Sequence, residues 1–291
     1  MSLFAGLEEI VKAHEPLGPY TWFGIGGPAE YLITPQSEQQ LQEVVRRCRE
    51  NEISMRVLGG GANLLIDDAG VEGAVIHLGG EFGQVEVLAD GVRAGAAADM
   101  GRLVLRCIRE GLSGLEGLTG VPGTIGGCVR MNAGGSFGDV GSTIQSVRVM
   151  TDEGEQFTRH RDDLSFGYRN SNITSKFILD ATFGLTPDEP SRVLRQVKQI
   201  WIYKKNTQPL GRSNAGCVFK NPRGLSAGAL IDNAGLKGRR IGGAHISEKH
   251  GNFIVADPGG TAADVLKLIN VIRDAVYEKA GVYLELEIEV W

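Results

Sequence analysis

Glycine, gathered into short runs between apolar segments, constrains the fold of this chain more than any other feature. The chain has 42 glycines among 291 residues, about twice the usual share of roughly 7%. The glycines follow no collagen-like period, so they predict loops within a globular fold. Four segments combine glycine with asparagine or arginine: residues 57–63, 120–127, 166–170 and 216–222. Bare backbone N–H groups in such runs can close on an anion, so these segments are candidate binding loops.

Composition and charge exclude several classes of protein. The chain is 42% hydrophobic and 22% charged, as in an ordinary globular protein of about two domains. The net charge of −5 and the lack of a basic run argue against a nucleic-acid partner. No segment approaches the ~20 apolar residues that span a bilayer, and the N-terminus lacks a signal-peptide pattern. We therefore expect a cytoplasmic protein with no membrane partner.

The cysteines predict neither disulfides nor a metal site. Cys48, Cys107, Cys128 and Cys217 show no metal-ligand spacing, and nothing marks secretion. Cys48 and Cys107 lie on apolar faces of expected helices. We expect three of the four cysteines to be structural and single out Cys217 for its loop position.

Hydrophobic periodicity and capping residues indicate a small α/β region at the start of the chain. Ser37 and Gln40 form a capping box for a helix that Asn51 ends. Strands are expected at 31–33 and 55–58, which gives a βαβ unit that leads into the first glycine run.

The rest of the sequence predicts a strand-rich middle region and a third segment with both helices and strands. One helix is expected near 98–110 and a basic helix at 190–206. A last helix begins after the cap Thr261 and stops at Gly281. Residues 282–291 alternate and predict one closing strand. Further strands are expected at residues 74–78, 85–88, 91–95, 146–150 and 177–183.

The first two glycine runs each allow two interpretations. Gly59-Gly60-Gly61-Ala62-Asn63 matches neither a Walker loop nor a G-x-G-x-x-G turn into a helix. A tight structural turn and an anion-binding nest are equally supported there. The run 120–127 suits a flat ring or a diphosphate, with bulges in a glycine-rich sheet as the alternative. Two nests in one chain suggest a dinucleotide.

Three kinds of side chain could carry chemistry. Arg169 has the bidentate fork that suits a carboxylate, although an isolated Tyr-Arg pair is usually a surface feature. A thiol has a reference pKa of about 8.5, so Cys217 could donate a proton, act as a nucleophile or be buried and inert. No histidine is nearby in sequence, which favours the proton donor over the nucleophile. Glu285, Glu287 and Glu289 would repel one another on a buried face but more often form a solvated one.

In this order, the motifs resemble the UDP-N-acetylenolpyruvoylglucosamine reductase family. The resemblance runs from Thr21-Trp22-Phe23-Gly24 to the C-terminus and includes Leu284-Glu285-Leu286-Glu287. It implies an α+β chain with an FAD-binding fold of the vanillyl-alcohol-oxidase type in two lobes, plus a C-terminal α/β substrate domain. The expected boundaries are 1–58 joined by strand 285–291, then 59–200, then 207–284.

The resemblance also implies an enzyme of peptidoglycan precursor synthesis. NADPH would reduce tightly bound FAD, and the reduced flavin N5 would pass hydride to the enolpyruvyl methylene of UDP-N-acetylglucosamine enolpyruvate, giving UDP-N-acetylmuramate. Arg169 and a protonated Glu287 would stabilise the negative charge, and Cys217 would supply the proton. Better-known members place serine at the position of Cys217.

The expected partner is a UDP-sugar, and the chain is expected to be a monomer. The positions implied to contact substrate are Tyr168, Lys205, Gly216 and Asn221. Those implied to contact the cofactor are Gly59, Gly60, Gly61, Ala62, Asn63, Leu64, Pro122, Gly123, Thr124, Gly126, Gly127, Asn132, Ala133 and Gly134. Two rivals remain: an oxygen-dependent sugar oxidase of the same flavin fold, and a non-enzymatic nucleotide-binding or flavin-sensing module that would need neither Arg169 nor Glu287.

Overall fold

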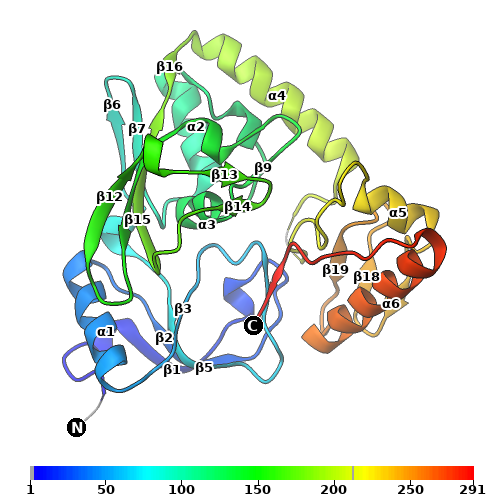
Figure 1. Ribbon diagram of the computed structural model, residues 1–291, viewed down its shortest axis with the longest axis horizontal. Coiled ribbons are helices and arrows are strands. Elements are labelled where there is room, and N and C mark those ends of the chain that lie inside the picture. Colours follow the sequence, from blue (N-terminus) through cyan, green and yellow to red (C-terminus); the bar gives the residue numbers. More distant parts are fainter. Residues whose placement is uncertain (1–2, 212) are drawn as a thin grey trace. The chain divides into compact units, whose positions relative to one another are not determined.

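The computed structural model describes residues 3–211 and 213–291, which form two compact units (Figure 1). Each unit is described by itself. Unit 1 comprises Met1–Ala13, Tyr31–Gly60 and Gly73–Tyr203, and unit 2 comprises His14–Glu30, Gly61–Glu72 and Lys204–Trp291. The expected boundaries of the three-part division stay predictions.

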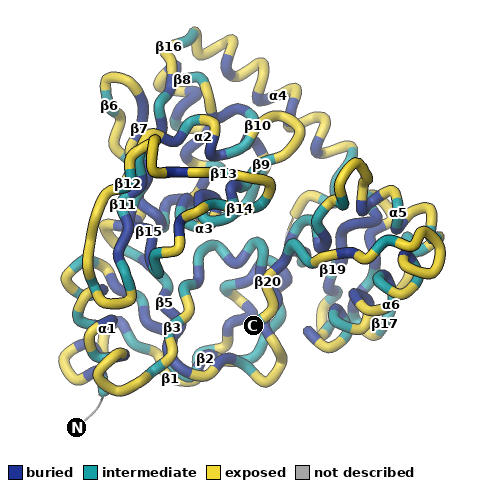
Figure 2. Tube along the Cα trace, viewed as in Figure 1, coloured by how far each residue is buried: buried dark blue, intermediate teal, exposed yellow. Residues whose placement is uncertain are grey.

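The helices and strands together confirm the expected α+β class. The α-helices of the described residues are α1 (Glu38–Glu50), α2 (Met100–Glu110), α3 (Ile125–Arg130), α4 (Pro190–Thr207), α5 (Ala227–Asn233) and α6 (Ala262–Ala280). Helix α3 was not expected, because its short, glycine-rich sequence carries little helical periodicity. Figure 2 shows α4 largely exposed, with buried positions at helical spacing.

The start of the chain forms the expected strands around α1. A four-stranded sheet has the order β1-β2-β5-β3, so β5 lies between the two strands of the expected βαβ unit. Its strands are β1 (Val11–Pro16), β2 (Pro28–Ile33), β3 (Met55–Val57) and β5 (Val71–Ile76).

Ser37 caps α1 as expected, because its side chain accepts the Gln40 N–H at 3.3 Å. The reciprocal half of the capping box differs from the prediction. The Gln40 side chain accepts the N–H of Gln36, one residue before the cap. Asn51 ends the helix as expected.

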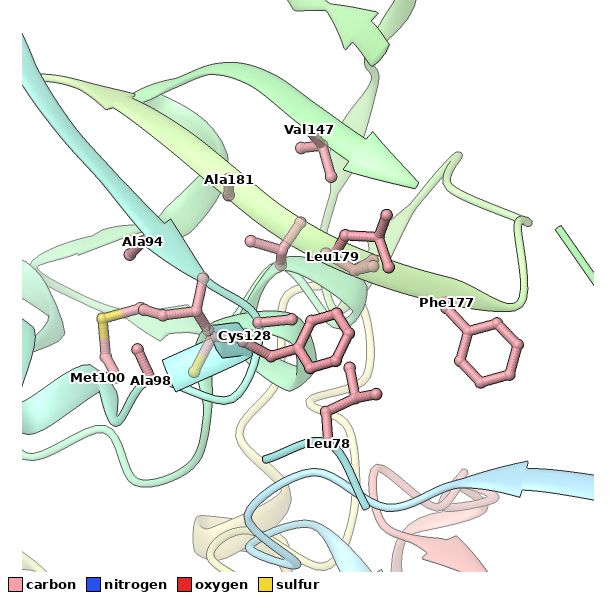
Figure 3. Close-up of a cluster of buried hydrophobic side chains, with 14 of the residues drawn as sticks. Leu78, Ala94, Ala98, Met100, Cys128, Val147, Phe177, Leu179 and Ala181 are labelled. Atoms are coloured by element: carbon pink, nitrogen blue, oxygen red, sulfur yellow. The ribbon is translucent and has the colours of Figure 1, made fainter. Parts of the chain in front are cut away.

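An antiparallel sheet forms the centre of unit 1. Its order is β12-β11-β15-β7-β6. Its strands are β6 (Val85–Leu88), β7 (Gly91–Gly95), β11 (Ile144–Met150), β12 (Gln156–His160) and β15 (Phe177–Gly184). Helix α3 packs against β15. Figure 3 shows Met100 of α2 and Cys128 of α3 among buried side chains of this sheet, which include Ala94, Leu179 and Ala181.

Unit 2 has its own core around α6. Helix α6 packs against α5 and against a three-stranded sheet of order β17-β18-β19. These strands are β17 (Arg240–Ile241), β18 (Ala244–Ile246) and β19 (Ile254–Ala256). The ends of α6 confirm the sequence signals: the Thr261 side chain accepts the Asp264 N–H at 3.1 Å, and Gly281 takes the left-handed conformation with φ of 65°.

The expected closing strand, residues 282–291, is wrong in extent. Only β20 (Glu289–Val290) is a strand, paired in parallel with β4 (Leu64–Leu65). The main chain before it bonds instead to the loop around Phe219, which forms an isolated bridge with Leu286. The alternation holds for buried Leu284 and Ile288 but fails at exposed Val290.

His250 lies in the loop between β18 and β19. Its Nδ1 accepts the Asn252 N–H at 3.2 Å, and its ring lies edge-on to Phe253. Burial, followed by the charge of Lys237, lowers the pKa of His250 below its usual 6.5. Neutral His250 is therefore the form that the fold favours.

We expect the free energy of unfolding to fall as pH drops below 6.5. Unfolded His250 binds a proton at a higher pH than folded His250, so acid favours the unfolded chain, with a slope of at most about 1.4 kcal/mol per pH unit from this residue. His250→Gln, which can still accept the Asn252 N–H, should flatten this part of the profile. Urea unfolding from pH 5 to 8 measures both proteins, and identical slopes would contradict the prediction.

Candidate functional site

Within unit 1, the start of the first expected glycine loop packs closely against the second loop. A Cβ built on Gly59 would lie 2.7 Å from the Thr124 Oγ1, and one built on Gly60 would lie 2.8 Å from the Gly123 Cα. Any side chain at either position would push the loops apart. These glycines therefore serve close packing, as the structural interpretation of the first run requires.

The same loops leave open backbone surface nearby. A Cβ built on Gly127 would meet nothing closer than 3.7 Å, and one on Gly135 would meet nothing within 4 Å. Two N–H bonds at 2.9 Å, from Ile125 to the Ala98 carbonyl and from Gly126 to the Ala96 carbonyl, tie the loop to the segment after β7. A flat group could lie against this anchored backbone without displacing a side chain.

The other expected cofactor positions are distributed over both units. In unit 1, Pro122 precedes α3, Ala133 donates its N–H to the Cys128 carbonyl, and Gly134 pairs with Asp139. In unit 2, the Gly61 carbonyl accepts the Trp22 N–H, Ala62 follows Gly61, and Leu64 begins β4.

Tyr168 and Arg169 form the tip of a two-residue hairpin. It joins β13 (Phe166–Gly167) to β14 (Asn170–Ser171). Arg169 has φ of 55°, a left-handed conformation that costs free energy for a residue other than glycine. Its guanidinium lies 5.1 Å from the Tyr168 ring centroid, and Tyr168 is 54% exposed. The hairpin thus presents a cation and an aromatic ring together at a strained turn.

A buried asparagine holds this hairpin. Asn132 donates its side-chain N–H to the Gly167 carbonyl at 2.9 Å and accepts the Gly141 N–H at 2.8 Å. Its neighbour Gly141 has no room for a side chain, because a Cβ there would lie 2.4 Å from the Phe166 ring. The side chain of Asn132, expected at the cofactor, therefore bonds to backbone beside Arg169.

In unit 2, the segment carrying Cys217 runs beside the segment carrying Glu287. The Glu287 N–H donates to the Val218 carbonyl at 2.8 Å, and the Lys220 N–H donates to the Glu285 carbonyl at 2.9 Å. Cys217 precedes Val218 directly, so these bonds bring the main chains of Cys217 and Glu287 near one another.

Glu287 differs in its surroundings from the glutamates on either side. Glu287 is half-buried, whereas Glu285 and Glu289 are exposed. Lys220 lies 3.7 Å from the Glu285 carboxylate in an exposed pair. The Asn63 side chain donates to the Glu287 carbonyl at 2.9 Å. The row of three is therefore not a uniform solvated face, and Asn63 bonds directly to the residue that the family pattern singles out.

Cys217 is also distinct among the four cysteines. It is half-buried, whereas Cys48, Cys107 and Cys128 are buried. Burial raises the pKa of the Cys48 and Cys107 thiols to about 11 and that of Cys128 to about 12. These three are structural, as expected, and the buried interpretation of Cys217 is wrong.

The expected substrate positions in unit 2 lie on loops and at a helix end. The Asn221 side chain accepts the Ala227 N–H at 2.9 Å, which ties its loop to α5. Gly216 has φ of 73°, and its N–H donates to the Asn214 side chain. The Lys205 carbonyl accepts the Lys249 Nζ at 2.9 Å, while the Lys205 side chain is exposed.

Within unit 2, the segments carrying Cys217, Glu287 and Asn63 lie side by side. Within unit 1, Tyr168 and Arg169 share one turn. Sequence reasoning missed Asn252, whose buried side chain bonds to the backbone of Phe219. The available signal was a polar residue directly before the apolar run Phe253-Ile254-Val255-Ala256.

Two searches of the described residues gave negative results. No group of three or more His, Cys, Asp or Glu side chains within residues 3–211 and 213–291 is placed to hold a metal ion. Among the helices of the same residues, none is both long and apolar enough to cross a bilayer.

Two family models match the chain. Residues 29–159 match an FAD binding domain. Residues 208–291 match the C-terminal domain of UDP-N-acetylenolpyruvoylglucosamine reductase. The first match includes both glycine loops of unit 1, whose open backbone beside Gly127 and Gly135 fits a flat cofactor. The expected FAD is confirmed as the cofactor class.

Similar proteins agree with these models over nearly the whole chain. UDP-N-acetylenolpyruvoylglucosamine reductase of Carboxydothermus hydrogenoformans is 40% identical, covering 96% of this chain and 93% of that protein. The Syntrophus aciditrophicus reductase is 41% identical, covering 95% and 90%. The crystal structure of the Thermus caldophilus reductase has a TM-score of 0.84 and 42% identity, covering 95% and 97%.

A variant of Phl p 4, described as a glucose oxidase, shares the fold alone. Its TM-score is 0.50 and its identity is 17%, and the match covers 62% of this chain and 42% of the Phl p 4 chain. The expected flavoenzyme fold and oxidoreductase class are confirmed. The chain belongs to the UDP-N-acetylenolpyruvoylglucosamine reductase family.

Proposed function

We propose that this chain uses NADPH to reduce UDP-N-acetylglucosamine enolpyruvate to UDP-N-acetylmuramate. Family membership supports a reductase of a peptidoglycan precursor. The observation that carries the finer assignment is the bond from the Glu287 N–H to the Val218 carbonyl, because it sets Glu287 beside the residue after Cys217. A thiol proton donor and a carboxyl acid on neighbouring segments suit the protonation of a substrate carbon.

FAD, when bound, accepts two electrons from NADPH and supplies the hydride that reaches the methylene carbon of the enolpyruvyl group. The protein must then stabilise negative charge on the adjacent carbon and its carboxylate. Arg169 binds this carboxylate through its guanidinium, and protonated Glu287 donates a hydrogen bond to it. In this proposal their combined effect lowers the barrier, because both donors would face the negative charge that develops in the transition state.

Cys217 completes the reduction by giving its Sγ proton to the carbon next to the new methyl group. The C=C bond is then replaced by two C–H bonds, one from the hydride and one from the thiol. Water returns a proton to the thiolate, so one proton from solvent is consumed in each turnover. Tyr168, Lys205, Gly216 and Asn221 hold the UDP-sugar in this assignment.

Anaerobic reduction followed by substrate addition tests the function. We expect NADPH to bleach the flavin absorbance, and only the enolpyruvyl sugar-nucleotide to restore it, because its C=C bond is the electron acceptor. Glucose and air are the control additions for the sugar-oxidase rival. Restoration by air with glucose, but not by the sugar-nucleotide, would overturn the proposal, and a protein without flavin absorbance would support neither enzyme.

Glu287→Gln should keep its flavin and its reduction by NADPH, but its reoxidation by substrate should slow by about 100-fold or more, since an amide N–H is a much weaker hydrogen-bond donor to the developing charge than a carboxylic acid. The matched control is Glu285→Gln, two residues away and exposed. Stopped-flow absorbance separates the two half-reactions. Equal reoxidation rates in the two variants would remove Glu287 from the mechanism.

Cys217→Ala should slow reoxidation by about 100-fold or more, whereas Cys217→Ser should retain more activity because a hydroxyl can still carry the proton. Iodoacetamide should modify Cys217 before the other three thiols, which are buried. Cys48→Ala serves as the control that leaves the inactivation rate unchanged. Mass spectrometry showing first modification at another cysteine would contradict this assignment.

A further inference from the structure

Asn252 bonds to the segment between the thiol and the carboxyl residue. Its backbone carbonyl accepts the Val218 N–H at 2.9 Å. Its side-chain Oδ1 accepts the Phe219 N–H at 2.9 Å, and its Nδ2 donates to the Phe219 carbonyl at 2.7 Å. Asn252, Val218 and Phe219 are all buried.

Asn252 supplies most of the hydrogen-bond partners of the Val218 and Phe219 backbone. Val218 and Phe219 together have two N–H groups and two carbonyls. Asn252 binds three of the four, and the Glu287 N–H binds the remaining Val218 carbonyl. The side-chain amide thus acts as the partner that a neighbouring strand would normally supply. A buried backbone group left without that partner is costly, so the arrangement resists displacement.

Asparagine is well suited to this task. Its amide presents one acceptor and one donor side by side, which match the N–H and carbonyl of a single strand residue. The Asn252 N–H bonds in turn to His250 Nδ1 at 3.2 Å. The asparagine is therefore held by its own backbone while its side chain holds Phe219.

We propose that Asn252 is the positioning residue that sets the separation of Cys217 from Glu287. Cys217 precedes Val218 directly, and Glu287 bonds to that same Val218, so both reacting residues are located relative to one clamped segment. The proposal rests on the roles assigned above to Cys217 and Glu287. Asn252 touches neither reacting group and acts through the backbone, so its loss should affect proton delivery rather than flavin binding.

Two substitutions of Asn252 remove its side-chain hydrogen bonds to Phe219 to different extents. Asn252→Asp keeps an acceptor for the Phe219 N–H and loses the donor to the Phe219 carbonyl, whereas Asn252→Ala loses both. We expect flavin reoxidation by the sugar-nucleotide to slow by about 10-fold in the first and about 100-fold in the second, because small misplacements of reacting groups are costly. Flavin reduction by NADPH should stay within about twofold of the unchanged enzyme.

The control variant must lose a similar free energy of unfolding without any change to the Val218–Phe219 segment. Val276→Ala removes two methyl groups from the buried face of α6 in the same unit. All variants are compared by urea unfolding, flavin content and the two half-reactions. Reoxidation in both Asn252 variants that equals the Val276→Ala rate would overturn the proposal, since stability alone would then explain the effect.

A second measurement, the rate at which iodoacetamide alkylates Cys217, does not depend on catalysis. Iodoacetamide should modify Cys217 about tenfold faster in Asn252→Ala than in Val276→Ala, because the released segment opens locally. If the unchanged enzyme is not reoxidised by the sugar-nucleotide, the proposed function fails, while this alkylation rate still decides whether Asn252 positions the thiol.

Should Asn252→Ala not fold, the Asn252→Asp rates decide. If neither variant folds, hydrogen exchange of the Val218 and Phe219 amides in the unchanged enzyme decides, and fast exchange would overturn the proposal.

Discussion

The hydrogen bond from the Glu287 N–H to the Val218 carbonyl is the constraint on which the candidate site of unit 2 depends. It joins residues almost seventy positions apart, and it does so without a long strand on either side. Only Phe219 and Leu286 form a bridge there, and β20 adds a two-residue pairing with β4. Such short pairings are weak by themselves. The side chains of half-buried Asn63 and buried Asn252, which bond to the same segments, supply the order that regular strands do not.

The glycine runs show that the two interpretations of such loops are compatible. Gly59 is required because the Thr124 hydroxyl lies against it, and Gly60 because the backbone of Gly123 and Thr124 does. At Gly127, a few residues after Thr124, a Cβ would meet only the Thr124 Oγ1, at 3.7 Å. Close packing of one part of the loop therefore fixes the backbone of the next part, where a cofactor can approach. A binding nest built in this way needs no charged side chain, which agrees with a chain whose net charge is −5.

Sequence patterns predicted what short-range forces decide. The caps Ser37 and Thr261 and the stop at Gly281 were correct because each acts within one helical turn. The closing strand was wrong because alternation over 282–291 says nothing about which backbone is available to pair with it. Asn252 was missed for a similar reason: its position before an apolar run marks it as unusual, but its partner Phe219 lies 33 residues away and no local pattern identifies that partner. The family resemblance proposed Cys217 and Glu287 as reacting residues, but the contacts that bring their segments together are long-range.

In each unit a buried asparagine bonds to the backbone near a residue of the proposed reaction, and the reason lies in the length of the elements. Arg169 sits on a hairpin with two-residue strands, and its strained φ of 55° would relax if the turn were free to move. Asn132 bonds to the Gly167 carbonyl at the base of that hairpin, as Asn252 bonds to Phe219 beyond Cys217. A longer strand would hold either residue by its own ladder, but its pleat would also fix the side-chain direction. A hydrogen bond from an asparagine side chain anchors the backbone without a strand ladder. The direction of the neighbouring side chain is then set by its own turn and not by the pleat of a strand.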